Sequence, residues 1–232
     1  MIVIRPAESR GHNTFGWLDT YHTFSFGEYV DPAHHQFRAL RVLNEDRVQP
    51  DQGFGTHGHK EMEILTWLLA GTLAHQDSMG HRSRLQPGSA QAMSAGTGIR
   101  HSEFNGSATE PVHFLQIWLL PDTANLEPRY QEAAFPDPEL RNRLRLIASR
   151  DGAEGSVVLF QDVRIHAARL DPGKSVVHAF QDGRYGYVQV AKGAVELNGR
   201  AMKAGDGAAL SQEARAMVQA SVASEILLFD LA

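Results

Sequence analysis

Short apolar runs alternate with turn-forming residues along the whole chain. Glycine and proline recur at close intervals between these runs, which is the pattern of an all-β sandwich or barrel. Helix signals are sparse, and the clearest is the charged segment Pro138–Leu144, which begins with proline. The pattern predicts strands at Phe37–Asn44, Met62–Leu69, Thr72–Gln76, Ser89–Met93, Val112–Leu120, Ser156–Phe160, Arg164–Leu170, Gly186–Ala191, Ala194–Leu197, Ala214–Gln219 and Glu225–Leu231.

The chain divides into two halves that resemble a degenerate repeat. The segment Leu68–His75 is similar to Val190–Leu197, and each contains a glycine before a new apolar run. The proline-rich stretch Pro121–Pro138 lies between the halves. We therefore predict two β-barrels from one duplicated unit, with an N-terminal barrel over residues 1–135 and a C-terminal barrel over residues 136–232.

The second half lacks the polar residues of the first. Aligning Gly193 with Gly71 places Ala179 and Gln181 where the first half has histidines, and no histidine follows His178. We therefore expect a degenerate C-terminal barrel without metal ligands, which serves as a docking surface or supports the first barrel.

Composition and charge narrow the class of protein. The net charge is −5, from 22 basic and 27 acidic residues among 232, and no basic block is present to follow a phosphate backbone. We expect no direct nucleic-acid partner. The absence of cysteine excludes disulfides, iron–sulfur clusters and thiolate zinc sites. The start Met1–Pro6 is unlike a signal peptide, and apolar runs such as Ile117–Leu120 are too short to span a bilayer. We expect a cytoplasmic protein without membrane contact.

Two short clusters carry the candidate chemistry, His57-Gly-His59 and His101-Ser-Glu103. In an extended strand, residues two apart point to the same face, so each cluster directs two donor groups to one point. Three imidazoles and one carboxylate predict a divalent transition-metal site. Iron(II) and nickel suit these donors, copper and zinc remain open on ligand type, and an octahedral metal keeps positions free for a substrate or dioxygen. The alternative is that these are chance polar residues on two strands.

The spacing of these residues resembles the two cupin motifs. The first reads Gly55-x-His57-x-His59-x3-Glu63-x7-Gly71, and the second, after Pro87-Gly88, reads Gly96-x4-His101-x3-Asn105. Further segments resemble the pirin family of bicupins, and most closely the bacterial pirin-like quercetin 2,3-dioxygenases: Gly11–Phe26, Arg41–Arg47, Gly53–His57, Glu61–Ile64, His75–Gly80, Met93–Glu103 and Leu227–Leu231.

This resemblance implies two cupin barrels of the double-stranded β-helix, or jelly-roll, type. It implies one divalent metal per chain, with iron(II) expected and nickel, cobalt, manganese, copper or zinc open. The ligands map onto His57, His59, His101 and Glu103. The implied reaction cleaves a flavonol such as quercetin at the 2,3 position with dioxygen, giving a depside and carbon monoxide. In that reaction Glu103 is the catalytic residue and accepts the proton of the substrate hydroxyl.

Glu63 departs from the general cupin pattern. The commoner cupins place a glutamate ligand where this chain has Ile64, and Glu63 is one residue out of register. Because a one-residue slip turns a strand side chain to the other face, the carboxylate ligand must come from Glu103. We predict that Glu63 orients a ligand imidazole, with a plain surface glutamate as the alternative.

Four apolar residues are candidates for a substrate pocket. Trp17 and Phe26 belong to an aromatic N-terminal segment that either packs in the core, which we favour, or lines the barrel mouth. Met93 and Phe114 lie on predicted strands next to the ligand clusters, so they could form an apolar wall.

Two other functions remain open from the sequence. Pirin relatives include metal-dependent or redox-sensing proteins that bind a transcription factor or a metabolic enzyme without catalysis. A third possibility is a cupin that isomerises or binds another small metabolite. Metal- and dioxygen-dependent turnover of a flavonol separates the first function from both alternatives.

Overall fold

The computed structural model describes residues 1–232, and the contacts between them divide the chain into two compact units. The unit that we call the first barrel contains Gly11–Ala134 and Val157–Gln161. The second barrel contains Met1–Arg10, Phe135–Ser156 and Asp162–Ala232. The N-terminal residues thus belong with the C-terminal half, because the first strand of the chain pairs with a strand near its end. No helix of the structure is long and apolar enough to cross a membrane.

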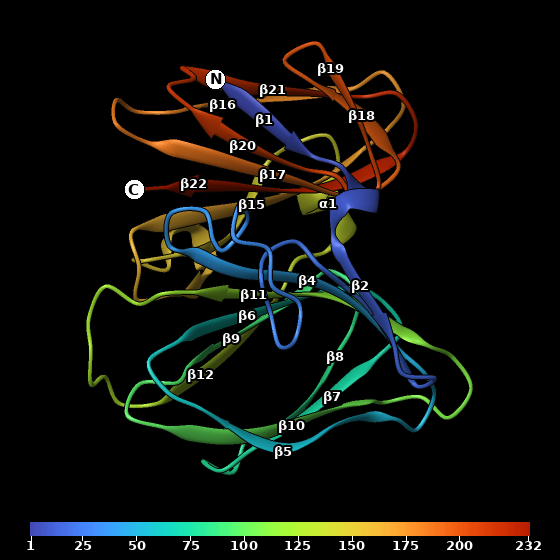
Figure 1. Cartoon of the computed structure of the whole chain (residues 1–232), viewed down its shortest axis with the longest axis vertical. Coiled ribbons are helices and arrows are strands. Elements are labelled where there is room, and N and C mark those ends of the chain that lie inside the picture. The colour runs from blue at the N-terminus through green and yellow to red at the C-terminus, as the bar shows by residue number, and fades with distance from the viewer. The chain divides into compact units, whose positions relative to one another are not determined.

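The first barrel consists of two antiparallel sheets (Figure 1). One sheet has the order β12-β9-β6-β11-β4-β3-β2 and the other has the order β5-β10-β7-β8. The strands of these sheets are β2 (Gly11–Thr14), β3 (Leu18–His22), β4 (Leu40–Val48), β5 (Gly53–His59), β6 (Glu63–Ala70), β7 (Leu73–Asp77), β8 (Arg82–Leu85), β9 (Ser89–Ser94), β10 (Ile99–Asn105), β11 (Val112–Leu119) and β12 (Arg129–Ala134). The two-residue strand β14 (Val157–Val158) belongs to the same compact unit and contacts β9 and β12.

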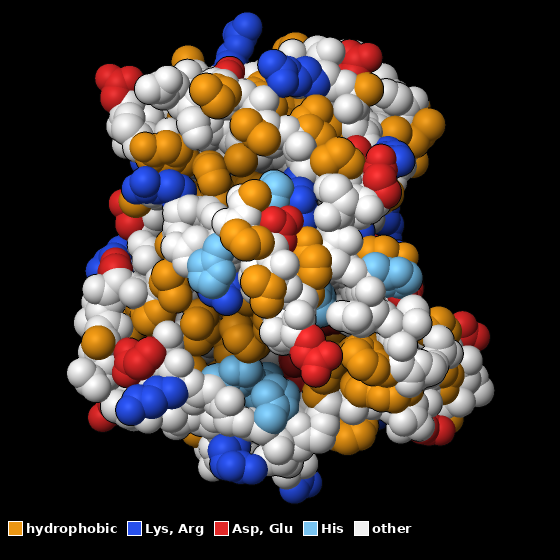
Figure 2. Space-filling model, viewed as in Figure 1, with side chains coloured by type: hydrophobic (Ala, Val, Ile, Leu, Met, Phe, Trp, Pro, Cys, Tyr) orange, Lys and Arg blue, Asp and Glu red, His pale blue; other side chains and the backbone are white.

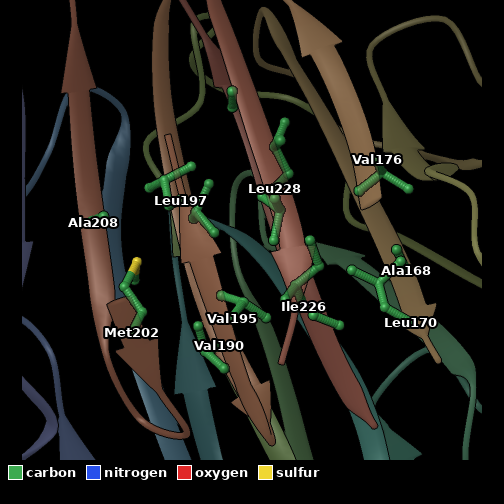
Figure 3. Packing of buried hydrophobic residues seen from close by; sticks show 14 of the residues in the cluster. Ala168, Leu170, Val176, Val190, Val195, Leu197, Met202, Ala208, Ile226 and Leu228 are labelled. Carbon is green, nitrogen blue, oxygen red and sulfur yellow. The ribbon is translucent and has the colours of Figure 1, made fainter. Parts of the chain in front are cut away.

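The second barrel repeats this arrangement: one of its sheets contains β1-β20-β17-β22-β15-β13 in this order, and the other has the order β16-β21-β18-β19. Its elements are β1 (Ile2–Arg5), η1 (Ala7–Ser9), α1 (Asp137–Leu140), β13 (Arg145–Ser149), η2 (Ala153–Gly155), β15 (Val163–Leu170), β16 (Ser175–Ala179), β17 (Tyr185–Lys192), β18 (Ala194–Leu197), β19 (Arg200–Lys203), β20 (Gly207–Ser211), β21 (Arg215–Ala220) and β22 (Ser224–Leu231). Aliphatic side chains from both sheets fill its interior (Figure 3). The prediction of two all-β barrels is confirmed.

The only α-helix is shorter than the sequence indicated. It covers Asp137–Leu140, whereas the predicted segment ran to Leu144. Asn142 has a φ of 55°, which lies in the left-handed region and cannot continue a right-handed helix. The chain enters β13 three residues later.

The two barrels have a glycine at the same turn. Gly71 and Gly193 have φ values of 77° and 81°, and a Cβ atom at either position would collide with the backbone of a neighbouring segment. Both glycines precede short equivalent strands, β7 and β18, so a conformation that only glycine adopts without strain marks the duplicated turn.

Strand register corrects one part of the repeat alignment. In the first barrel His101 on β10 lies opposite His57 on β5. In the second barrel the corresponding strand is β21, and there Ala216 lies opposite His178 on β16. The counterpart of His57 is therefore His178, and not Ala179 as the ungapped spacing indicated. The difference arises because the segment from the histidine to the aligned glycine is one residue longer in the second half, from His178 to Gly193, than in the first, from His57 to Gly71.

Candidate metal centre

The two predicted clusters lie side by side on neighbouring strands. β5 and β10 are antiparallel, with His101 opposite His57 and Ile99 opposite His59. A register shift between His101 and Glu103 marks a β-bulge, a feature that re-aims side chains near functional sites. The two β10 residues are both buried, whereas the intervening Ser102 is partly exposed, so alternation along the strand turns both of them into the barrel.

The three histidines converge through the same ring atom. The Nε2 atom of His101 lies 3.0 Å from the Nε2 atoms of both His57 and His59. If the Nε2 atom of His101 carries a hydrogen, that hydrogen can be donated to only one of the two neighbouring nitrogens. Hydrogen bonds from His101 therefore cannot satisfy both contacts. A cation between them would accept all three lone pairs.

The protonation of these rings also fits a cation. His57 places Nδ1 2.8 Å from the carbonyl oxygen of Gly55, so Nδ1–H donates, and the neutral ring with this hydrogen has its lone pair on Nε2. Burial, together with the neighbouring histidines, lowers the pKa of His59 to about 4 and that of His101 to about 3. The rings of His59 and His101 are therefore neutral at neutral pH. Neutral imidazoles with free nitrogens are the form that binds transition metals.

Glu103 lies beside His101 in a second group of possible donors. Its carboxylate lies with the donor atoms of His101 and His75 in a second group that spans less than 4.8 Å. It accepts a hydrogen bond of 2.9 Å from Gln116, and it lies 3.4 Å from donors on Thr66 and Gln91. Burial, followed by the charge of Asp46, raises the pKa of Glu103 to about 7. A divalent ion would offset this cost of burying the carboxylate.

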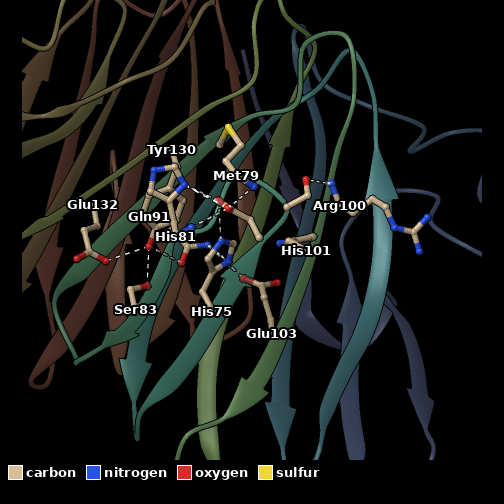
Figure 4. Close-up of polar contacts among 12 residues, drawn as sticks. His75, Met79, His81, Ser83, Gln91, Arg100, His101, Glu103, Tyr130 and Glu132 are labelled. Carbon is tan, nitrogen blue, oxygen red and sulfur yellow. Dashed lines mark hydrogen bonds and ion pairs between the residues drawn. The ribbon is translucent and has the colours of Figure 1, made fainter.

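His75 is packed beside this centre. Its ring stacks on Tyr130 at 4.8 Å, and its Nδ1 atom lies 3.2 Å from Nε2 of Gln91 (Figure 4). Asp77 lies 3.5 Å from the other ring nitrogen and also accepts bonds from His81. These contacts use both nitrogens of His75 within the protein, which favours a supporting histidine over a ligand.

A cavity of about 410 Å³ opens onto the centre. His57 and Glu103 form part of its wall, so donor groups of the metal centre face the space where a substrate would lie. Figure 2 shows histidine side chains at the surface next to a patch of hydrophobic side chains. The rest of the wall is mainly aromatic and small polar side chains: Asn13, Phe15, Leu18, Thr20, His22, Phe26, Asn44, Asp46, Phe54, Gln116 and Trp118, with Gly27 and Glu28.

The structure separates the four pocket candidates. Phe26 lines the cavity and packs edge-on against Trp118. Trp17 packs against Phe54 and does not line the cavity. Met93 and Phe114 are fully buried in the hydrophobic core and lie outside the cavity wall. These two side chains pack in the core, and the prediction that they form the wall of the pocket is wrong.

Glu63 does not contact a ligand histidine. It is 1 % exposed, so it is no surface glutamate. Its carboxylate accepts hydrogen bonds from the Ser94 hydroxyl at 2.8 Å and from the Phe160 backbone N–H at 3.1 Å. Burial raises its pKa. Within the first barrel, Glu63 ties β6 to β9 and to the segment after β14, a structural role.

Most of the cavity wall was not identified from the sequence, including Phe15, Asp46 and Gln116. Phe15 is 61 % exposed at the turn before β3, Asp46 lies among other polar residues on β4, and Gln116 is a polar residue on the largely apolar strand β11. A polar residue at an inward position of a hydrophobic strand is the signal that could have identified Gln116. Phe15 has no such signal, because its position depends on the turn.

Fold and donor set together define a class, the metal-binding bicupins. Family models match the chain in both halves: Pirin over residues 3–119 and the quercetinase C-terminal cupin domain over residues 146–231. The chain belongs to the pirin family.

Its relatives are similar over their whole length. A protein of Escherichia coli strain K12 named quercetin 2,3-dioxygenase is 45% identical over 231 residues, which cover 100% of this chain and 99% of the relative. The crystal structure of YhhW from E. coli matches with a TM-score of 0.96 at 45% identity, covering 100% and 98% of the two chains. A structure of the bacterial pirin YhhW in complex with nickel(II) matches with a TM-score of 0.94 at 44% identity, covering 100% and 99%. The chain is thus similar over its whole length to bacterial pirins.

Proposed function

We propose that this protein is a metal-dependent dioxygenase that cleaves flavonols such as quercetin at the 2,3 position. Dioxygen is the second substrate, and the products are a depside and carbon monoxide. The observation that carries the proposal is the cavity whose wall combines aromatic side chains with His57 and Glu103. The similarity to a relative named quercetin 2,3-dioxygenase supports the same reaction.

His57, His59, His101 and Glu103 are the residues that we propose to hold one divalent metal per chain. Iron(II) is the metal expected from the sequence, while the structure of a relative that is 44% identical contains nickel(II). A metal bound here would act as a Lewis acid and lower the pKa of a coordinated substrate hydroxyl.

The protein's own side chains bind and orient the substrate. A planar flavonol fits a slot with aromatic walls, and Phe26, Phe54 and Trp118 provide them. Glu103, at the inner end of the cavity, accepts the proton of the substrate hydroxyl. The buried position of this carboxylate keeps bulk water away from the proton that it holds.

The experiment measures loss of quercetin absorbance together with oxygen uptake. Metal-free protein is reloaded separately with Fe(II), Ni(II), Co(II), Mn(II) or Cu(II), and His101→Ala is carried through the same procedure. We expect turnover in at least one metal-loaded wild type and a loss of more than about 100-fold in the variant, beyond the typical cost of losing an outer partner of a metal ligand. The control is His35→Ala, which removes an exposed histidine in a loop and should keep full activity.

If no metal-loaded form consumed quercetin and oxygen, the proposed reaction would be contradicted. If the wild type then still bound one ion per chain and His101→Ala bound it weakly, the metal centre would stand without the flavonol reaction. The function would then have to be sought among metal-dependent protein partners and other small substrates.

A further inference from the structure

A row of polar side chains crosses the sheet beside Glu103. Asn44 on β4 lies opposite Gln116 on β11, Gln116 lies opposite Thr66 on β6, and Thr66 lies opposite Gln91 on β9. Directly opposed residues in a sheet point to the same face, so these four form one continuous line. The next residues on this face of β11 are aromatic, Phe114 on one side and Trp118 on the other. The row is therefore a polar line across a largely apolar wall.

The hydrogen bonds of this row give Gln116 one orientation. The Thr66 hydroxyl lies 2.8 Å from Oε1 of Gln116 and donates to it, because an amide oxygen only accepts. The amide nitrogen of Gln116 then faces Glu103, where it donates to Oε2 at 2.9 Å. Gln91 lies 3.4 Å from Oε1, the other carboxylate oxygen. Figure 4 shows Gln91 and Glu103 close to His75.

All these donors to Glu103 are neutral side chains. A neutral donor fixes the direction of a carboxylate without cancelling its charge, so the charge stays available for a cation. The second barrel shows the contrast, because there Asp230 accepts from the Arg184 guanidinium at 2.6 Å and from His178 at 2.7 Å. A carboxylate paired with a guanidinium has its charge compensated inside the protein.

We propose that Gln116 is a positioning residue for the metal centre. Thr66 fixes the amide of Gln116, and Gln116 holds the Glu103 carboxylate in the direction that metal binding and proton acceptance require. This inference rests on the proposed metal site. It concerns side chains that touch neither the proposed metal nor its three histidines.

The test replaces Gln116 with methionine, which has a similar length and lacks the amide donor. Three variants are compared with the wild type: Gln116→Met, Thr66→Val and the double variant. Ni(II) affinity is measured by competition with a chelator, the visible spectrum is recorded with Co(II), and KM and kcat for quercetin are determined separately. Gln76→Met on the exposed side of β7 is the matched control.

We expect Gln116→Met to lower Ni(II) affinity by about 10–100-fold, the usual effect of removing an outer partner of a ligand. The Co(II) spectrum should change and kcat should fall. Because Gln116 also lines the cavity, the Ni(II) affinity and the Co(II) spectrum, which the loss of a substrate contact alone would not alter, carry the test. Thr66→Val should weaken binding less. In the Gln116→Met background it should add nothing, since it would act through the missing amide.

Several results would overturn the inference. Equal Ni(II) affinity and an unchanged Co(II) spectrum in Gln116→Met would do so, as would an equal loss in Gln76→Met. If Gln116→Met failed to fold, Thr66→Val would decide the question, and unchanged Ni(II) affinity and Co(II) spectrum in that variant would reject the role. A wild type that bound no metal would reject the proposed metal site itself, which distinguishes the two failures.

Discussion

At the scale of single residues, two buried carboxyl groups line the cavity of the first barrel. Burial raises the pKa of both Asp46 and Glu103 to about 7. Each carboxyl destabilises the folded protein when it ionises, because the charged form loses its hydration. The chain tolerates this cost where a cation or a substrate is expected to bind.

Asp46→Asn tests this cost. The pKa of Asp46 is raised from 3.8 to about 7 on folding, so its proton stabilises the folded state at low pH, and this contribution is lost as pH rises through 7. We expect the variant to gain about 3 kcal/mol relative to the wild type between pH 5 and pH 8, from roughly two pH units at 1.36 kcal/mol each. Urea unfolding in the presence of a chelator measures the difference at both pH values.

The control for this experiment is Asp182→Asn, at an exposed position in the second barrel. It should change stability equally at pH 5 and pH 8. A pH-independent effect of Asp46→Asn would show that the buried carboxyl ionises in the folded protein as readily as in water.

The sequence predicts which residues of one strand share a face, but it does not predict which residues of different strands come into contact. His57 with His59, and His101 with Glu103, share a face because they are two residues apart. Gln116 lies on a different strand from Glu103, and their contact depends on how the two sheets fold over each other. Spacing alone carries no signal for such a pair.

At the scale of elements, the longest apolar strands followed the prediction, whereas the shorter β13 (RLIAS) and β20 (GAALS) were not predicted. The predicted run Met62–Leu69 is β6 (Glu63–Ala70), and the predicted run Glu225–Leu231 is β22 (Ser224–Leu231). The strands that carry the proposed ligands had no apolar run, because β5 reads GFGTHGH and faces a polar site. They were recognisable only by their chemistry, since hydrophobic periodicity detects strands that pack against a core.

The pairing of β5 with β10 depends on Gly53. A Cβ atom there would lie 2.5 Å from Cα of Phe104 and still closer to the carbonyl oxygen of Glu103. Gly53→Ala should therefore push the strands apart and destabilise the protein by about 1–3 kcal/mol, as overpacking does. We expect a lower Tm, at about 2–4 °C per kcal/mol, and weaker Ni(II) binding. Differential scanning calorimetry and chelator competition measure the two effects.

Gly55 offers a control on the same strand. A Cβ atom at Gly55 would meet nothing within 4 Å, so Gly55→Ala should keep both the Tm and the Ni(II) affinity. Equal behaviour of the two alanine variants would mean that β5 can shift without disturbing the histidines.

At the scale of the whole molecule, duplication has produced one barrel with a donor cluster and one without it. The register places Ala216 and His178 at the positions of His101 and His57. At these two positions the second barrel therefore has one histidine where the first barrel has two. In the second barrel, the carboxylate of Asp230 is bound by Arg184 and His178, so a guanidinium provides the positive charge there.

This contrast predicts that the chain binds one transition metal and that the second barrel contributes nothing to it. His57→Ala should abolish stoichiometric Ni(II) binding, because it removes one of three converging nitrogens. His178→Ala, at the matched position of the second barrel, should leave the stoichiometry at one ion per chain, because Arg184 already pairs with the nearby carboxylate. Equilibrium dialysis with metal analysis measures both variants beside the wild type. A wild type that bound two ions, reduced to one by His178→Ala, would show that the second barrel has kept a site of its own.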